Sequence, residues 1–151
     1  LSMKWHVRDG EGAMPAFGVI GQLDFASGSQ AFKGSGTRPS VRATAEWELA
    51  PEWSIGVMPG LVADRDDEGR HFASGMLGVS LDRGWTERLH TYFELAAPQI
   101  AKAHNGGTTS SFDFGGTYLL TKDCQVDAGL SRGLNHRTAD YSFTFGLSVR
   151  L

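Results

Sequence analysis

The sequence ends in YSFTFGLSVRL, residues 141–151, which alternates between two kinds of residue from start to finish. Every second residue from Tyr141 to Leu151 is apolar, whereas the residues between them are small or polar and include Arg150. A period of two places these two sets on opposite faces of a β-strand. In a soluble β-sandwich the apolar face would lie in the core, whereas in an outer-membrane barrel it would face lipid.

The same period of two recurs along the whole chain, with turn residues between the runs. In the first run, for example, Lys4, His6 and Arg8 share one face. The best helical candidate, residues 86–103, alternates as well, and Pro98 would interrupt a helix there. We therefore predict an all-β fold, an antiparallel up-and-down arrangement of about nine strands. The runs lie at residues 3–8, 17–25, 41–49, 53–64, 77–82, 89–97, 112–120, 126–131 and 141–151.

The composition excludes several classes of protein. A net charge of -3 and a pI near 5.9 do not favour nucleic acid as a partner. No window approaches the roughly 20 apolar residues of a transmembrane helix. The single cysteine, Cys124, cannot form an internal disulfide, and the histidines lack metal-ligand spacing. No motif of a serine hydrolase, zinc protease or P-loop enzyme occurs, so we expect no enzyme activity, no cofactor and no metal.

The connections between the predicted strands come in two lengths that alternate along the chain. Those at residues 50–52, 82–87 and 122–124 are short, whereas those at 26–39, 65–70, 98–109 and 133–140 are long and polar. Short turns at one rim and long loops at the other are typical of an outer-membrane β-barrel. The stretch at 65–70, RDDEGR, lacks the spacing of a calcium-binding loop, and we interpret it as a solvated charged loop.

Two further features favour a transmembrane β-barrel over a soluble β-sandwich or lipocalin-like carrier. Glycine and serine are frequent on the face opposite the apolar one, as expected where side chains crowd a narrow lumen. Aromatic residues lie toward strand ends and turns, where interfacial girdles occur. The residues predicted for this aromatic girdle are Trp5, Trp47, Trp53, Trp85, Phe112 and Tyr141.

The odd number of predicted strands bears on how many strands the whole barrel has. Bacterial single-chain barrels have even strand numbers, and this sequence begins almost inside a strand. We therefore expect residues 1–151 to be a single β-barrel domain, the C-terminal portion of a larger barrel with one or more strands missing at the N-terminus.

The segments TYFELAAPQ, residues 91–99, and residues 112–151 resemble the outer-membrane family known as "MetA-pathway of phenol degradation", whose members are also called transporters. The resemblance implies a porin-like channel in the outer membrane of a Gram-negative bacterium, for passive uptake of small, aromatic or hydrophobic compounds. It also implies the lipid bilayer and the outer-membrane assembly machinery as partners. The sequence departs from the family in ending on Leu151, where such barrels commonly end on phenylalanine. The matching positions are Tyr92, Glu94, Leu95, Gly115, Tyr118, Leu119, Leu120, Gln125, Asp127, Gly133, Leu134, Asn135, Asp140, Tyr141, Gly146, Leu147, Ser148, Arg150 and Leu151.

If the apolar face meets lipid, the opposite face lines the lumen and carries charges of both signs. These charges would either pair across the lumen and plug it, or hold water and set an ion preference. Glu94, Asp127 and Arg150 are the first candidates for such pairing. The alternatives to a channel are a non-conducting outer-membrane barrel that is structural or binds through its loops, and a soluble lipocalin-like carrier. The predicted lumen residues are Arg42, Glu46, Glu48, His90, Glu94, Asp113, Gln125, Asp127 and Arg150.

Overall fold

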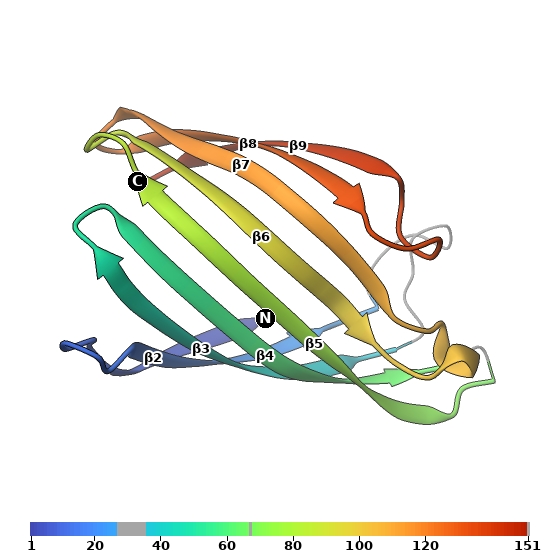
Figure 1. Cartoon of the computed structure of the whole chain (residues 1–151). Coiled ribbons are helices and arrows are strands. Elements are labelled where there is room, and N and C mark those ends of the chain that lie inside the picture. Colours follow the sequence, from blue (N-terminus) through green and yellow to red (C-terminus); the bar gives the residue numbers. More distant parts are fainter. Residues whose placement is uncertain (27–35, 67, 151) are drawn as a thin grey trace.

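Nine antiparallel strands form one sheet, in which each strand pairs with the next along the chain (Figure 1). The computed structural model describes residues 1–26, 36–66 and 68–150. In this part of the chain, no helix has the length and hydrophobicity needed to cross a membrane. The prediction of an all-β, up-and-down fold is confirmed. The elements are β1 (Ser2–Arg8), β2 (Ala16–Asp24), β3 (Arg38–Ala50), β4 (Trp53–Arg65), β5 (His71–Gly84), β6 (Leu89–Ile100), the 3-10 turn η1 (Ala103–Asn105), β7 (Thr109–Thr121), β8 (Cys124–Gly133) and β9 (Tyr141–Val149).

The strand register joins the alternating faces of single strands into two continuous faces of the sheet. Directly opposite residues on neighbouring strands point to the same side. One row crosses four strands as Gly56, Ser80, Glu94 and Asp113. The next row crosses them as Val57, Val79, Leu95 and Phe112. We call these sides the polar face and the apolar face. All carboxylates of the described strands lie on the polar face: Asp24, Glu46, Glu48, Asp64, Asp82, Glu94, Asp113 and Asp127.

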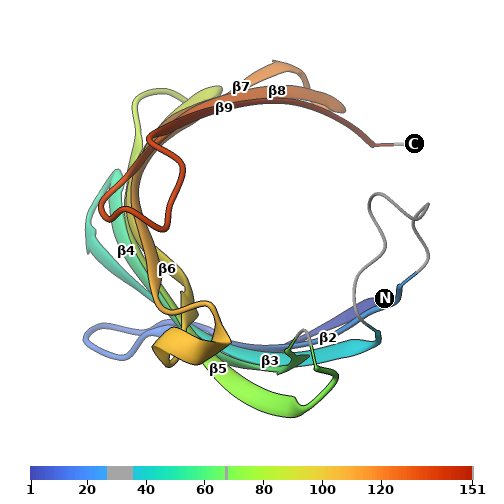
Figure 2. The same cartoon turned by 90° about the vertical axis from the view of Figure 1, so that its right-hand side faces the viewer.

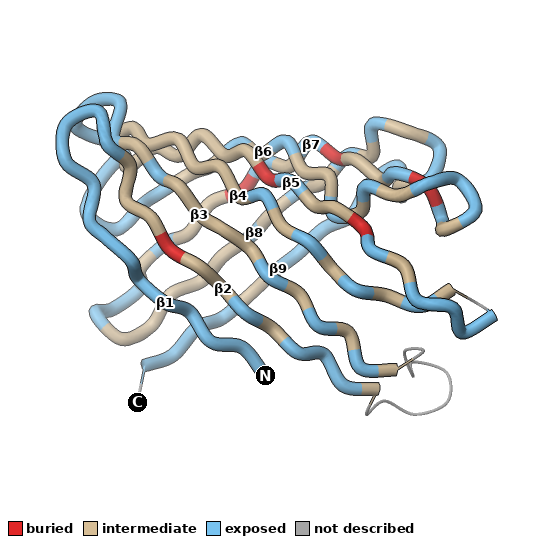
Figure 3. Tube along the Cα trace, turned by 90° about the horizontal axis from the view of Figure 1, so that it is seen from below, coloured by how far each residue is buried: buried red, intermediate tan, exposed pale blue. Residues whose placement is uncertain are grey.

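The sheet curls into an arc, with β1 and β9 as its two unpaired edges (Figure 2). Side chains converge on the concave side of a curved sheet, and therefore bury one another there. In the described strands the buried residues all lie on the polar face, and they are few (Figure 3): Gly18, Ser74, Gly78, Ser111 and Gly115. No hydrophobic side chain of the described residues is buried. The polar face is therefore concave and the apolar face convex, the reverse of a soluble barrel.

Glycine makes room for one large side chain on the concave face. Tyr92 of β6 lies across the neighbouring strands β7 and β8. A Cβ built on Gly115 would stand 2.6 Å from the Tyr92 Oη, and one built on Gly129 would stand 3.0 Å from it. The small residues of the polar face thus relieve crowding inside the curve, as the sequence predicts.

A β-bulge corrects the predicted position of one charged residue. The register of β1 against β2 shifts between His6 and Arg8. Arg8 consequently lies opposite Phe17, on the apolar face, instead of sharing the polar face with Lys4 and His6. The extra residue of a bulge reverses the alternation beyond it, and the sequence pattern does not reveal this.

The three connections predicted to be short share one end of the strands, which we call the short-turn rim: residues 51–52, 85–88 and 122–123. The connection at residues 9–15 lies at the same end but has seven residues, as many as the connection at 134–140. The connections at residues 25–37, 66–70, 101–108 and 134–140 share the other end, the long-loop rim. At the long-loop rim, Asn135 joins two of the loops, because its side-chain amide donates to the Thr108 carbonyl at 3.2 Å and to the Ser110 hydroxyl at 2.8 Å.

Candidate functional site

The concave polar face holds the predicted lumen residues and is the candidate site. Eight of the nine lie on it, and the ninth, Arg150, follows the end of β9 at the short-turn rim. The backbone N–H of Arg150 donates to the Asp123 carbonyl at 2.9 Å. Arg42, Glu46 and Glu48 come from β3, His90 and Glu94 from β6, Asp113 from β7, and Gln125 and Asp127 from β8.

Neighbouring strands bring some of these residues together. Glu94 lies directly opposite Asp113, and His90 lies opposite Thr117, which in turn faces Asp127. Asp113 accepts a hydrogen bond from the Ser111 hydroxyl at 3.0 Å. No ion pair within 4.0 Å joins any two of the nine in the described part of the chain. Their side chains therefore share a surface without forming a mutual pairing network.

A hollow of about 350 Å³ lies on this face over strands β3 to β6. Its walls combine carboxylates with small and apolar groups, and Ser80 donates to Asp82 at 2.8 Å within it. Asp82 and Tyr92 are not among the predicted lumen residues, although the period of two already puts them on the face of Glu94. Side chains that project into the hollow come from Glu46, Met58, Ser80, Asp82, Tyr92 and Glu94.

Charge is unevenly distributed over the concave face. On β5 to β9 this face carries the carboxylates of Asp82, Glu94, Asp113 and Asp127, and no lysine or arginine. Its lysine and arginine residues lie on β1 and β3 instead, where carboxylates accompany them: Lys4, Arg38 and Arg42. The half of the arc from β5 to β9 is therefore negative, which attracts cations to that wall.

One ion pair on the polar face is not predicted by the sequence pattern. Arg38 and Asp64 form it at 2.7 Å, with the Asp64 side chain 15% exposed. The two residues lie on β3 and β4, which a turn at the opposite rim connects. Only the strand register brings them together at the long-loop rim.

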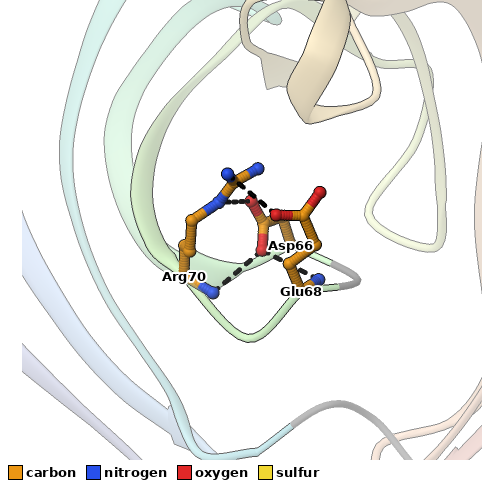
Figure 4. A network of polar contacts seen from close by, with 3 residues as sticks. All are labelled: Asp66, Glu68 and Arg70. Carbon is orange, nitrogen blue, oxygen red and sulfur yellow. Dashed lines mark hydrogen bonds and ion pairs between the residues drawn. The ribbon is translucent and has the colours of Figure 1, made fainter.

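The charged loop between β4 and β5 binds its own carboxylate (Figure 4). Asp66 accepts from the backbone N–H groups of Glu68 at 3.0 Å and Arg70 at 2.8 Å, and from the Arg70 side chain at 2.8 Å. Arg70 also pairs with Glu68 at 2.8 Å. The hydrogen bond from the Arg70 side chain is the largest cause that lowers the pKa of the Asp66 carboxyl below its ordinary value of 3.8. The carboxylates of Asp66 and Glu68 thus bind donors within the same loop.

We expect the Asp66 contacts to depend on pH. Because the folded-state pKa is depressed, their stabilising contribution is fully present above pH 3.8 and is lost as the pH falls through the lowered value. Asp66→Asn should weaken these contacts already at neutral pH, since it removes the negative charge that Arg70 binds. The protection factors for amide hydrogen exchange at Glu68 and Arg70, each taken relative to the intrinsic rate at the same pH, should fall in both cases. Glu68→Gln is the control with a smaller effect, because that side chain is 69% exposed. Unchanged exchange in Asp66→Asn would contradict this explanation.

The predicted aromatic girdle lies on the apolar face. Trp47 and Trp53 stand near the short-turn rim, Trp85 belongs to a turn of that rim, and Trp5 is at the middle of β1. Tyr141 and Phe112 lie toward the long-loop rim. Trp5 is 69% exposed and Tyr141 60% exposed. Three of the four tryptophans therefore lie toward the short-turn rim of the convex face, with Tyr141 and Phe112 toward the opposite rim.

The family of the chain follows from a comparison with known proteins. In the described residues, no group of three or more histidine, cysteine or acidic side chains is placed to hold a metal ion. No curated protein matches the sequence. The model of one family, described as "Putative MetA-pathway of phenol degradation", matches residues 1–151, so the resemblance seen in the sequence is confirmed. The chain, with its single up-and-down sheet, belongs to this family.

Proposed function

We propose that the protein forms the wall of a β-barrel in the bacterial outer membrane and lets small, aromatic or hydrophobic compounds pass. This proposal rests on the curvature of the sheet, which puts the polar face on the concave side and the apolar face on the convex side. Large hydrophobic side chains cover the convex face and are exposed, whereas carboxylates, serines and glycines line the concave face. A lipocalin-like carrier needs the opposite arrangement, with its apolar face toward the ligand.

The exposed apolar surface would be costly in water. Phe143 is 82% exposed and Phe145 is 79% exposed. Removing one such side chain from water contributes about 1.5–3 kcal/mol, and the same face continues across all nine strands. A lipid bilayer supplies the apolar surroundings that this face requires.

The dimensions of the strands also fit a bilayer. A tilted transmembrane β-strand needs about 9–11 residues. Strands β3, β4 and β7 have 13 residues each, β5 has 14 and β6 has 12. These strands can cross the hydrocarbon region and still extend past it at the rims.

Passage of a solute is supported by the concave face together with the family description. The description refers to phenol degradation, and this face offers carboxylates, the Tyr92 ring and the Met58 thioether around one hollow. The proposal assigns no chemistry to the protein, only transfer of a solute along its polar face. Its further partners would be the bilayer and the outer-membrane assembly machinery, which reads the last strand of a barrel. Leu151, the departure from the family ending, lies outside the described residues.

Two measurements on detergent-refolded protein test the proposal. A folded band that resists SDS without heating and moves differently after boiling supports a closed membrane barrel. Channel conductance in planar bilayers should follow, and phenol should reduce the current more than cyclohexanol, which matches its size but lacks the aromatic ring. A protein that stays folded and monodisperse without detergent would overturn the membrane proposal. An inserted protein without conductance would instead support the non-conducting barrel whose loops bind.

The negative half of the concave face predicts a preference for cations. Glu94→Gln should lower the ratio of potassium to chloride permeability a few-fold, since one unit charge contributes about 1 kcal/mol at 4 Å in water. The reversal potential under a potassium chloride gradient measures this ratio. Glu87→Gln, in the exposed turn at residues 85–88, removes the same charge away from the concave face and should leave the ratio unchanged. An unchanged reversal potential in Glu94→Gln would show that this wall does not line the path.

A further inference from the structure

One arginine on the apolar face lies close to two indole rings. The register places Arg83 of β5 between Trp53 of β4 and Thr91 of β6. The Arg83 Cζ lies 4.9 Å from the Trp53 ring centroid and 3.7 Å from the Trp85 ring centroid. The Trp85 indole N–H donates to the Thr91 hydroxyl at 2.9 Å, which fixes that ring over the guanidinium.

Arg83 lacks a counter-ion in the described part of the chain. All carboxylates of the described strands project from the other face of the sheet, and Arg83 takes part in no ion pair there. Its Nε is buried without a hydrogen-bond acceptor among these residues. A guanidinium carries its five N–H donors in one plane, in a fixed fork. The arrangement therefore presents an unpaired, oriented positive charge.

The position of Arg83 in the sheet indicates what its partner should be. The residue lies one position before the end of β5, at the short-turn rim, where an apolar surface meets a turn. The next row of the apolar face toward the long-loop rim is Ile55, Leu81 and Phe93. A ligand that fits must combine a negative head with a long apolar tail. Short turns face the periplasm in bacterial barrels, so this rim would meet the inner leaflet of the outer membrane.

We propose that Arg83, Trp53 and Trp85 form a binding site for the phosphate of a glycerophospholipid, whose acyl chains lie along Ile55, Leu81 and Phe93. The guanidinium donates two parallel hydrogen bonds to the phosphate oxygens, and the two indole rings exclude water from the pair. This inference rests on the proposed membrane location. The arginine at the other rim, Arg132, is less enclosed, with its Cζ 5.9 Å from the single ring of Tyr141.

Native mass spectrometry of the refolded protein, released from detergent and titrated with phosphatidylglycerol, tests the site. Arg83→Gln should weaken lipid binding about tenfold, the loss expected for a charge-assisted bidentate pair. Arg88→Gln is the matched control, because Arg88 lies in the 85–88 turn and contacts no aromatic ring in the described residues. Equal binding by Arg83→Gln and wild type would overturn the proposal, as would an equal loss in Arg88→Gln.

A second comparison keeps the test decisive if Arg83→Gln fails to fold. The wild-type protein should bind phosphatidylglycerol but not diacylglycerol with the same acyl chains, and soluble glycerol phosphate should compete poorly. Binding of diacylglycerol would show that the phosphate is not recognised, and strong competition by glycerol phosphate would show that no lipid is needed. Failure of the membrane proposal itself would appear separately, as the absence of an SDS-resistant band.

Discussion

Phe114→Arg should destabilise the protein in lipid vesicles by about 2–4 kcal/mol, the cost of a basic side chain on the lipid-facing surface near the bilayer midplane. Phe114 lies in the middle of β7 on the apolar face, and its ring centroid is 4.9 Å from that of Phe93. Arginine at this position would place a charge in hydrocarbon and would also remove the contact between the two rings. Reversible guanidinium unfolding, followed by tryptophan fluorescence, measures the change in free energy of unfolding.

Thr117→Arg is the matched control for this experiment. Thr117 belongs to the same strand but projects from the polar face, between His90 and Asp127 on the neighbouring strands. The same arginine would there meet a carboxylate, and we expect little loss of stability. Comparing the stabilities of Phe114→Arg and Thr117→Arg shows whether the convex face meets lipid or water. Phe114 is 43% exposed, so replacing it by arginine would cost little stability if that face met water. Equal stability of Phe114→Arg and Thr117→Arg would therefore refute the lipid-facing assignment.

Gly115→Ala should cost about 1–3 kcal/mol, the usual penalty for adding a methyl group to a site without space. The new Cβ would stand 2.6 Å from the Tyr92 Oη and 2.7 Å from the Ala128 carbonyl oxygen. The tyrosine can turn away, but the backbone carbonyl belongs to the paired strand β8 and cannot. The same unfolding measurement in vesicles detects the loss.

Gly21→Ala and a double variant complete this test. A Cβ on Gly21, in β2, would have no heavy atom within 4 Å, so this substitution should leave stability nearly unchanged. Adding Tyr92→Phe to Gly115→Ala removes the hydroxyl and should restore part of the stability, whereas the close contacts with the Ala128 carbonyl oxygen and with the ring Cε1 of residue 92, both at 2.7 Å, remain. Full stability of Gly115→Ala on its own would contradict the close approach of the Ala128 carbonyl oxygen to Gly115.

Much of the candidate site could be predicted from the sequence, because period-two alternation is a local property. Whether a residue stands at an odd or an even position in its strand (its parity) already assigns it to a face. Glu94, Asp113 and Asp127 are in this way placed on the opposite face from their neighbours Phe93, Phe112 and Val126. The same parity assigns Trp53 to the apolar face and Asp82 to the polar face, although the latter was not selected for the lumen. Parity fails at a bulge, as Arg8 shows.

The sequence by itself determined which side chains share a face, since backbone geometry sends successive residues to opposite sides of a strand. Tertiary structure alone decided which face is concave, because curvature belongs to the whole sheet. It also decided which distant residues meet: Arg38 with Asp64, and Tyr92 with Gly129 across an intervening strand. Alternation is independent of register, whereas a contact between strands depends on how each strand is aligned with its neighbours.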